Sequence, residues 1–126
     1  MGFEVYERKS RPAVTDPIIG IQSAGSFSFN AAAFDLIRRH RPDDDELWVE
    51  VLFDGDEKII GFRAVEPKRI NSYPVRKQPA SNSYLSTGKG FLRFHGVVLG
   101  KPRQYDATEF PDGIVGFVLG KESFKE

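Results

Sequence analysis

The sequence predicts one mainly β domain with short helices, whose strands close into a β-barrel. Apolar and polar residues alternate at period two in several short runs, as in strands buried on one face. Glycine, proline and Asp-Gly signals separate those runs. The order strand, strand, short helix, hairpin occurs twice, and one such unit has too little core to be stable alone. Two copies that share a closed barrel bury a common core and remove open sheet edges.

The length and composition fit a single domain over residues 1–126. We divide it into repeat one (1–66), a linker (67–71), repeat two (72–120) and a tail (121–126). The absence of cysteine excludes disulfides and cysteine-ligated zinc. No apolar run approaches the roughly 18–20 residues that cross a bilayer, so we expect no membrane association. The N-terminus has no signal-peptide core, and a cytoplasmic location is therefore expected.

Three strands are expected at the start of repeat one. Phe3–Lys9 alternates at period two. Ile18–Gln22 is apolar and β-branched, and Ser26–Phe29 follows a turn near Ala24-Gly25. These runs predict short antiparallel strands.

A helix is expected from Ala31 to Arg38. Asn30 can cap it, because an asparagine side chain accepts a bond from an otherwise unpaired backbone N–H. Phe34 and Ile37 share one face at helical spacing and are the expected core contacts. Pro42 ends the helix.

The clearest hairpin joins Trp48–Phe53 to Ile59–Val65. Asp54-Gly55 lies between these apolar runs, and Asp-Gly is a strong short-range turn signal. We expect Trp48 and most phenylalanines to fill the barrel interior with large side chains.

Repeat two is expected to have the same order of elements. Short strands are expected at 73–78 and 82–86, and a weak helix at 88–96 with Thr87 as N-cap and Gly96 just beyond its C-terminus. A second hairpin joins 103–110 to 114–119 through Pro111-Asp112-Gly113.

Corresponding residues of the halves support a repeat. Around the two helices, the same number of residues separates the two members of three pairs: Asn30 and Thr87, Phe34 and Phe91, and Ile37 and Phe94. In the hairpins, a slightly smaller number of residues separates Gly61 from Gly116 and Phe62 from Phe117. Chance similarity between short apolar segments is the alternative, but the order of the elements also agrees.

The run "GSFSFNAAAFDLI…LWVEVLFDGDEKIIGFRAV" resembles the AbrB/MazE/SpoVT type of swapped-hairpin domain. The resemblance is good over about Ile18 to Val65 and weak over Ser72 to Leu119. It implies an intertwined, pseudo-two-fold swapped-hairpin-like barrel, here formed by one chain, and DNA binding as a regulator or antitoxin. Family members usually carry arginine after the glycine and proline at the helix start.

Ser26 and Asn30 stand at those two family positions in the first half. In the second half, Asn82 replaces the glycine and Thr87 the proline. The basic residues that the family presents to DNA are therefore absent from their motif positions.

The centre of the chain is basic despite a formal net charge of zero. From Arg63 to Arg103 there are nine basic residues and one acidic residue, a net charge of +8. Such residues can contact phosphates without reading sequence, and Tyr73 and Tyr84 could stack on bases. The alternative is a solvated face balanced by acids elsewhere. The candidate nucleic-acid-binding residues are Lys68, Arg69, Arg76, Lys77, Lys89, Arg93, Lys101 and Arg103.

Other chemistry is not indicated. "STGKG", residues 86–90, resembles a phosphate-binding loop, but Gly90 stands where Ser or Thr is needed and Ser83 where glycine is needed. Asp43–Glu46 lacks the spacing of a calcium loop and is expected to neutralise the arginines at 38, 39 and 41. His40 and His95 follow predicted helices without a metal-ligand pairing. We therefore expect no enzyme, catalytic residue, metal, cofactor or small-molecule ligand.

The sequence thus favours a DNA-binding regulatory or accessory protein of the AbrB type, active in transcription regulation. A protein–protein interaction module without nucleic-acid binding is the alternative. A protein partner or a homodimer also stays open. The DNA-binding hypothesis predicts that the central basic residues gather on one surface, whereas the interaction-module hypothesis predicts that they lie among acids.

Overall fold

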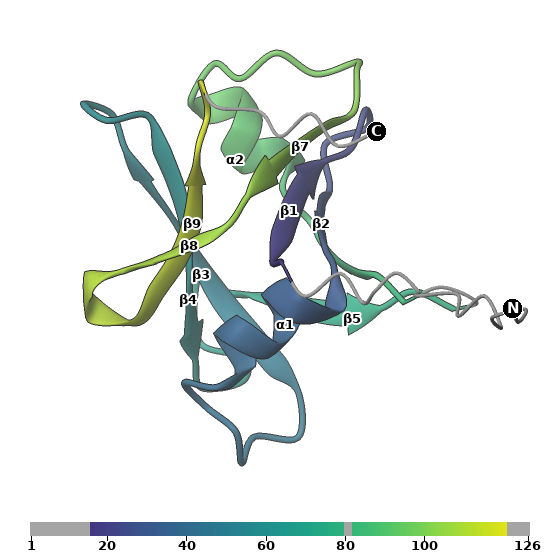
Figure 1. Ribbon diagram of the computed structural model, residues 1–126, viewed down its shortest axis with the longest axis vertical. Helices are drawn as coiled ribbons and strands as arrows, with labels where there is room; N and C mark the ends of the chain where they lie inside the picture. Colours follow the sequence, from purple (N-terminus) through teal and green to yellow (C-terminus); the bar gives the residue numbers. More distant parts are fainter. Residues whose placement is uncertain (1–15, 80–81, 121–126) are drawn as a thin grey trace, which may run out of the picture.

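Antiparallel strands surround one apolar core in the computed structural model of the chain (Figure 1). The structure describes residues 16–79 and 82–120. The strand expected at Phe3–Lys9 lies outside these residues, as does the tail expected at 121–126. The mainly β, barrel-like fold class is confirmed.

The described residues form nine strands, two α-helices and one 3-10 turn. The strands of the first half are β1 (Ile18–Ile21), β2 (Phe27–Phe29), β3 (Leu47–Asp54) and β4 (Ile59–Val65). Those of the second half are β5 (Tyr73–Lys77), β6 (Tyr84–Ser86), β7 (Arg103–Asp106), β8 (Thr108–Phe110) and β9 (Ile114–Val118). The helices are α1 (Ala31–Arg38) and α2 (Lys89–Phe94), and the 3-10 turn is η1 (Pro111–Gly113).

The strands are hydrogen-bonded in the order β7-β1-β2-β6-β5-β3-β4-β9-β8. Only Ala107 separates β7 from β8, so the two ends of this order meet and the barrel is nearly closed. The expectation of one strand over residues 103–110 is therefore wrong. β7 pairs with β1 whereas β8 pairs with β9, and the buried Ala107 donates its N–H to the Pro17 carbonyl between them (3.0 Å).

Exchange of the two halves leaves the pattern of strand pairing unchanged. The β1–β2 pairing of the first half matches the β5–β6 pairing of the second half. The β3–β4 hairpin likewise matches the β8–β9 hairpin. Between the halves, the pairing of β1 with β7 matches the pairing of β5 with β3. The remaining pairings, β2 with β6 and β4 with β9, join corresponding strands.

The registers of these two central pairings match the intervals in the sequence. Ser28 lies opposite Leu85, and this pair is separated along the chain by the same interval as Asn30 and Thr87. Gly61 lies directly opposite Gly116, its counterpart in the second hairpin. Residues that these sequence intervals relate therefore lie opposite each other in both pairings.

Aromatic side chains from both halves meet in the core. The Phe27 and Phe29 rings contact Phe62 edge to face, with centroids 4.8 and 5.1 Å away. The Tyr105 ring stacks on Phe117 at 4.4 Å. Phe62 and Phe117, from β4 and β9, lie 6.4 Å apart and link the two clusters. Burial of these large rings stabilises the fold, because apolar area is removed from water.

Trp48 is not a core residue, contrary to the sequence prediction. It lies half-buried on the outer face of β3, where its Nε1 donates to Glu46 Oε1 (3.0 Å). Successive side chains of a strand point to opposite faces. Because Leu47 and Val49 point into the core, Trp48 between them points outward.

Asn30 caps α1 as predicted and also ties the helix to the sheet. Its Oδ1 accepts the N–H of Ala33 (2.9 Å) and the N–H of Ile18 at the start of β1 (3.0 Å). Ile37 is fully buried, and Phe34 packs half-buried against the core. One side chain thus fixes both the start of the helix and its position beside β1.

The predicted N-cap of α2 is wrong. Its N-cap is Gly88, not Thr87, and no side chain caps it. A Cβ at Gly88 would lie 2.4 Å from the Phe27 ring, so the close approach of α2 to the core requires glycine.

The C-terminus of α2 agrees with the prediction. Gly96 adopts φ 72°, donates to the Arg93 carbonyl (3.0 Å), and lets Val97 N–H reach the Leu92 carbonyl (2.9 Å). These two bonds form a Schellman motif. The expected core position of Phe94 is wrong, because Leu92 is buried and Phe94 is 83% exposed.

We predict that Gly116→Ala lowers the free energy of unfolding by about 1–3 kcal/mol, as overpacking does. The added Cβ would lie 2.3 Å from the Ile60 carbonyl oxygen and 2.8 Å from Gly61 Cα, both backbone atoms. Urea unfolding measures the change. Gly90→Ala is the matched control, because its Cβ meets nothing within 4 Å and a gain of up to about 1 kcal/mol is expected. Equal stability of Gly116→Ala and wild type would contradict the close approach.

Asn30→Ala is expected to destabilise the protein by about 0.5–2 kcal/mol, since the Ala33 and Ile18 N–H groups lose their acceptor. Asn30→Asp keeps an acceptor oxygen for both N–H groups, but it replaces the Nδ2 donor to the Asp16 carbonyl with a second acceptor oxygen. In thermal unfolding, the melting temperature of Asn30→Asp should therefore be well above that of Asn30→Ala. An equal loss for both variants would show that the cap oxygen is not the stabilising atom.

Candidate nucleic-acid interface

The eight predicted basic residues divide into two groups. Lys68, Arg69, Arg76 and Lys77 lie on β5 and on the loop that precedes it. Lys89, Arg93, Lys101 and Arg103 lie on α2 and on the segment that leads into β7. Figure 1 shows α1 at the lower end of the barrel and α2 at the upper end. The first group neighbours the α1 end, so the basic stretch of sequence is not one surface.

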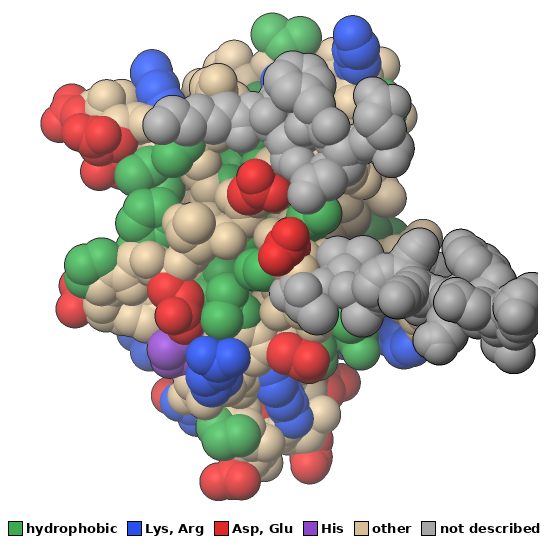
Figure 2. Space-filling view, viewed as in Figure 1, with side chains coloured by type: hydrophobic (Ala, Val, Ile, Leu, Met, Phe, Trp, Pro, Cys, Tyr) green, Lys and Arg blue, Asp and Glu red, His purple; other side chains and the backbone are tan. Residues whose placement is uncertain are grey.

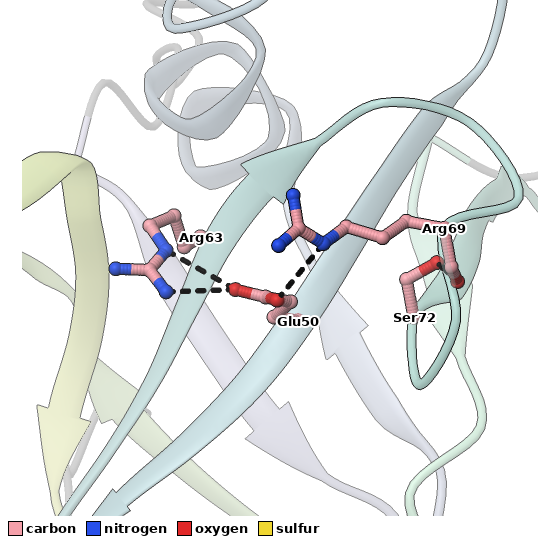
Figure 3. A network of polar contacts seen from close by, with 4 residues as sticks. All are labelled: Glu50, Arg63, Arg69 and Ser72. Atoms are coloured by element: carbon pink, nitrogen blue, oxygen red, sulfur yellow. Dashed lines mark hydrogen bonds and ion pairs between the residues drawn. The ribbon is translucent and has the colours of Figure 1, made fainter.

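Arg69 is held by a carboxylate on β3. Its Nε lies 3.4 Å from Glu50 Oε2, while Nε and the guanidinium NH2 of Arg63 donate to Glu50 Oε1 at 3.2 and 2.8 Å (Figure 3). Consecutive turns bring Arg69 there, since its N–H donates to the Glu66 carbonyl and its own carbonyl accepts from Ser72. Part of the positive charge of this group is therefore offset within the protein.

The other cations of the first group also lie near acids. The Arg76 guanidinium is 4.0 Å from Glu46 Oε2. Arg76 and Lys77 line a surface hollow of about 320 Å³ together with Asp45 and Glu46. Lys68 lines a separate hollow with the run 43–46. This surface combines both signs of charge.

Of the arginines at 38, 39 and 41, Arg41 alone pairs with a carboxylate of the run 43–46 in the described part of the chain. Arg41 forms an ion pair with Asp44, and this hydrogen bond raises the pKa of Arg41. Arg38 donates to the Asp44 backbone carbonyl. Arg39 instead lies 3.7 Å from Glu109 on β8. Figure 2 shows basic and acidic side chains interspersed at this end.

The second group contains the cations that stand apart from the acids of the described residues. Arg103 is used structurally, because its guanidinium donates to the Val98 carbonyl and holds the loop before β7. Lys89, Arg93 and Lys101 are exposed, and across residues 16–79 and 82–120 their side chains form no ion pair or hydrogen bond. We call these three residues the α2-end cations.

Two apolar side chains are exposed beside the α2-end cations. Phe94 at the end of α2 is 83% exposed and Val98 is 77% exposed. Their neighbours Val97 and Leu99 pack against the core. The loop therefore alternates inward and outward side chains, and backbone bonds to Leu92 and Ser23 fix this alternation.

An aromatic row connects Phe94 with the core. The His95 ring lies 4.9 Å from Phe94, 4.6 Å from Phe91 and 4.2 Å from Phe53 on β3. Phe91 in turn lies 6.2 Å from Phe27 in the core. The exposed ring is thus supported from beneath by other rings.

Sequence reasoning named different aromatic residues for stacking. Tyr84 already stacks on Phe34, with centroids 3.8 Å apart and planes 10° apart. Tyr73 is 36% exposed on β5 beside the mixed charges of the first group. Phe94 was missed, because its alignment with the buried Ile37 indicated a core position. A usable signal was that Leu92, Val97 and Leu99 already supply apolar residues at this end.

No group of three or more His, Cys, Asp or Glu residues in the described part of the chain could hold a metal ion. Among the same residues, no helix has the length and apolarity to cross a membrane. No family model, curated protein or solved structure matches the chain.

Arg103→Ala is predicted to destabilise the protein by about 0.5–1.5 kcal/mol, because the exposed Val98 carbonyl loses its guanidinium donor. Lys101→Ala removes a neighbouring exposed cation and should change stability by less than about 0.5 kcal/mol. Urea unfolding of the two variants provides the comparison. Similar effects of both would contradict the structural role assigned to Arg103.

Proposed function

We propose that this protein is a DNA-binding regulatory or accessory protein that contacts phosphates through the α2-end cations, Lys89, Arg93 and Lys101. One observation carries the proposal: these three cations lie on one end of the barrel without an acidic partner in the described chain. Unpaired cations gain most from phosphates, because contact releases condensed counterions from the nucleic acid. Arg69 and Arg76 are weaker candidates, since each already has a carboxylate.

The architecture supports an AbrB-like origin for this function. We propose that the two halves arose by duplication of one β-β-α-β-β unit, so that one chain forms the barrel that an intertwined dimer would otherwise form. The support is that strand pairings are unchanged when the halves are exchanged, with Ser28 opposite Leu85 and Gly61 opposite Gly116. Fold alone does not assign function, which is why the proposal rests on the α2 end.

A protein–protein interaction module is the second candidate. The pairing of Arg69 with Glu50 and of Arg76 with Glu46 favours it, because it reduces the free positive charge. The exposed Phe94 also favours it, since aromatic residues are enriched in interface cores.

The charge-reversal variant Lys89→Glu/Arg93→Glu/Lys101→Glu tests the leading proposal. Fluorescence anisotropy with labelled DNA at low salt should show that the variant loses binding. Three phosphate contacts predict that log K falls with log[salt] with a slope of about −2 to −3 for the wild type. A wild type that does not bind at low salt, or that binds independently of salt, would overturn the proposal.

The matched control reverses Lys68 and Lys77, exposed cations near the α1 end. This double variant should bind nearly as well as the wild type, after comparison of their thermal unfolding. If the control loses binding and the α2-end variant keeps it, the interface lies on the other group.

A further inference from the structure

We infer, resting on the proposed function, that the α2 end prefers single-stranded nucleic acid and that Phe94 is its base-stacking platform. The inference combines three observations: an aromatic ring that the core does not use, a support that holds this ring in place, and nearby cations that no acid of the described residues neutralises.

The exposure of Phe94 has no structural cause within the described chain. Leu92 is fully buried, and Val97 and Leu99 pack against the same core, so the apolar needs of α2 are met without Phe94. The ring nevertheless stays 83% exposed. An exposed ring offers a π face on which a base of any identity can stack.

The ring that contacts Phe94 belongs to the aromatic row. The Phe94 ring is nearly perpendicular to His95 (88°), which in turn contacts Phe53 and Phe91. The Schellman motif at Gly96 fixes the backbone directly after this pair. Phenylalanine has only two side-chain torsions, so it loses little side-chain entropy when a base stacks on it.

The cations lie on the same helix as Phe94 and just after the loop that follows this helix. Lys89 and Arg93 are one helical turn apart on α2, Arg93 immediately precedes Phe94, and Lys101 follows the loop that exposes Val98. Proteins that bind single strands combine basic grooves with stacking aromatics. A duplex stacks its bases on one another and offers its phosphates but not base faces, so only an unpaired strand uses both features.

The test compares a thymidine homopolymer of about 20 nucleotides with a duplex of equal length, by fluorescence anisotropy at fixed salt. The wild type should bind the single strand more tightly. Phe94→Ala should weaken single-strand binding by about 5- to 150-fold, leaving the salt slope and duplex binding nearly unchanged. Phe94→Trp should retain binding, whereas Phe94→Leu, apolar but not aromatic, should behave like Phe94→Ala.

Ile70→Ala is the matched control, because Ile70 is equally exposed (80%) but lies in the loop before β5. It should leave both affinities unchanged, and thermal unfolding of each variant confirms that the fold is retained.

The outcomes separate this inference from the proposed function. Duplex binding that exceeds single-strand binding, lost on charge reversal but unaffected by Phe94→Ala, overturns the inference and leaves the proposed function in place. Binding of neither nucleic acid by the wild type overturns both. Full retention of single-strand affinity by Phe94→Leu would overturn stacking in favour of simple apolar contact.

Discussion

The close approach of β4 and β9 at Gly61 and Gly116 is the constraint on which the rest of the structure depends. A Cβ at Gly61 would lie 2.4 Å from the Ile114 side chain, and one at Gly116 would meet the backbone of β4. This contact joins the two halves of the chain beside Phe62 and Phe117, whose rings link the core clusters. With the β2–β6 pairing, it makes a barrel from segments that would otherwise be two incomplete sheets.

Elements governed by local signals were predictable from the sequence. Asn30 set the start of α1, and Asp-Gly together with alternating residues set the β3–β4 hairpin. The failures depended on neighbours that are distant in the sequence. Trp48 lies outside because its flanking residues face the core, and β7 separates from β8 because the chain changes partner at Ala107. For the site, residue types were predictable, but their division between two ends and the exposure of Phe94 required the pairing of the strands.

The two ends of the barrel share a framework but differ in charge. The loop after α1 carries the acidic run Asp43–Glu46, and its arginines are paired with acids. The segment after α2 carries Lys101 and Arg103 and no acid before Asp106. A formal net charge of zero therefore conceals arginines that pair with acids after α1 and cations that form no ion pair at the α2 end of the described chain. The proposed interface follows from this asymmetry, not from total charge, because local potential attracts a polyanion.

The exchange of strands between the halves also affects how the protein is made. β1 pairs with β7, β2 with β6, and β4 with β9, so much of the sheet of the first half depends on strands that emerge later from the ribosome. Until β9 is synthesised, β4 has an unpaired edge and the apolar faces of the first half lack a cover. Such edges promote aggregation of a nascent chain. The topology that allows one chain to close a barrel thus delays closure until synthesis of the domain is nearly complete, and it makes chaperone protection of the nascent first half advantageous.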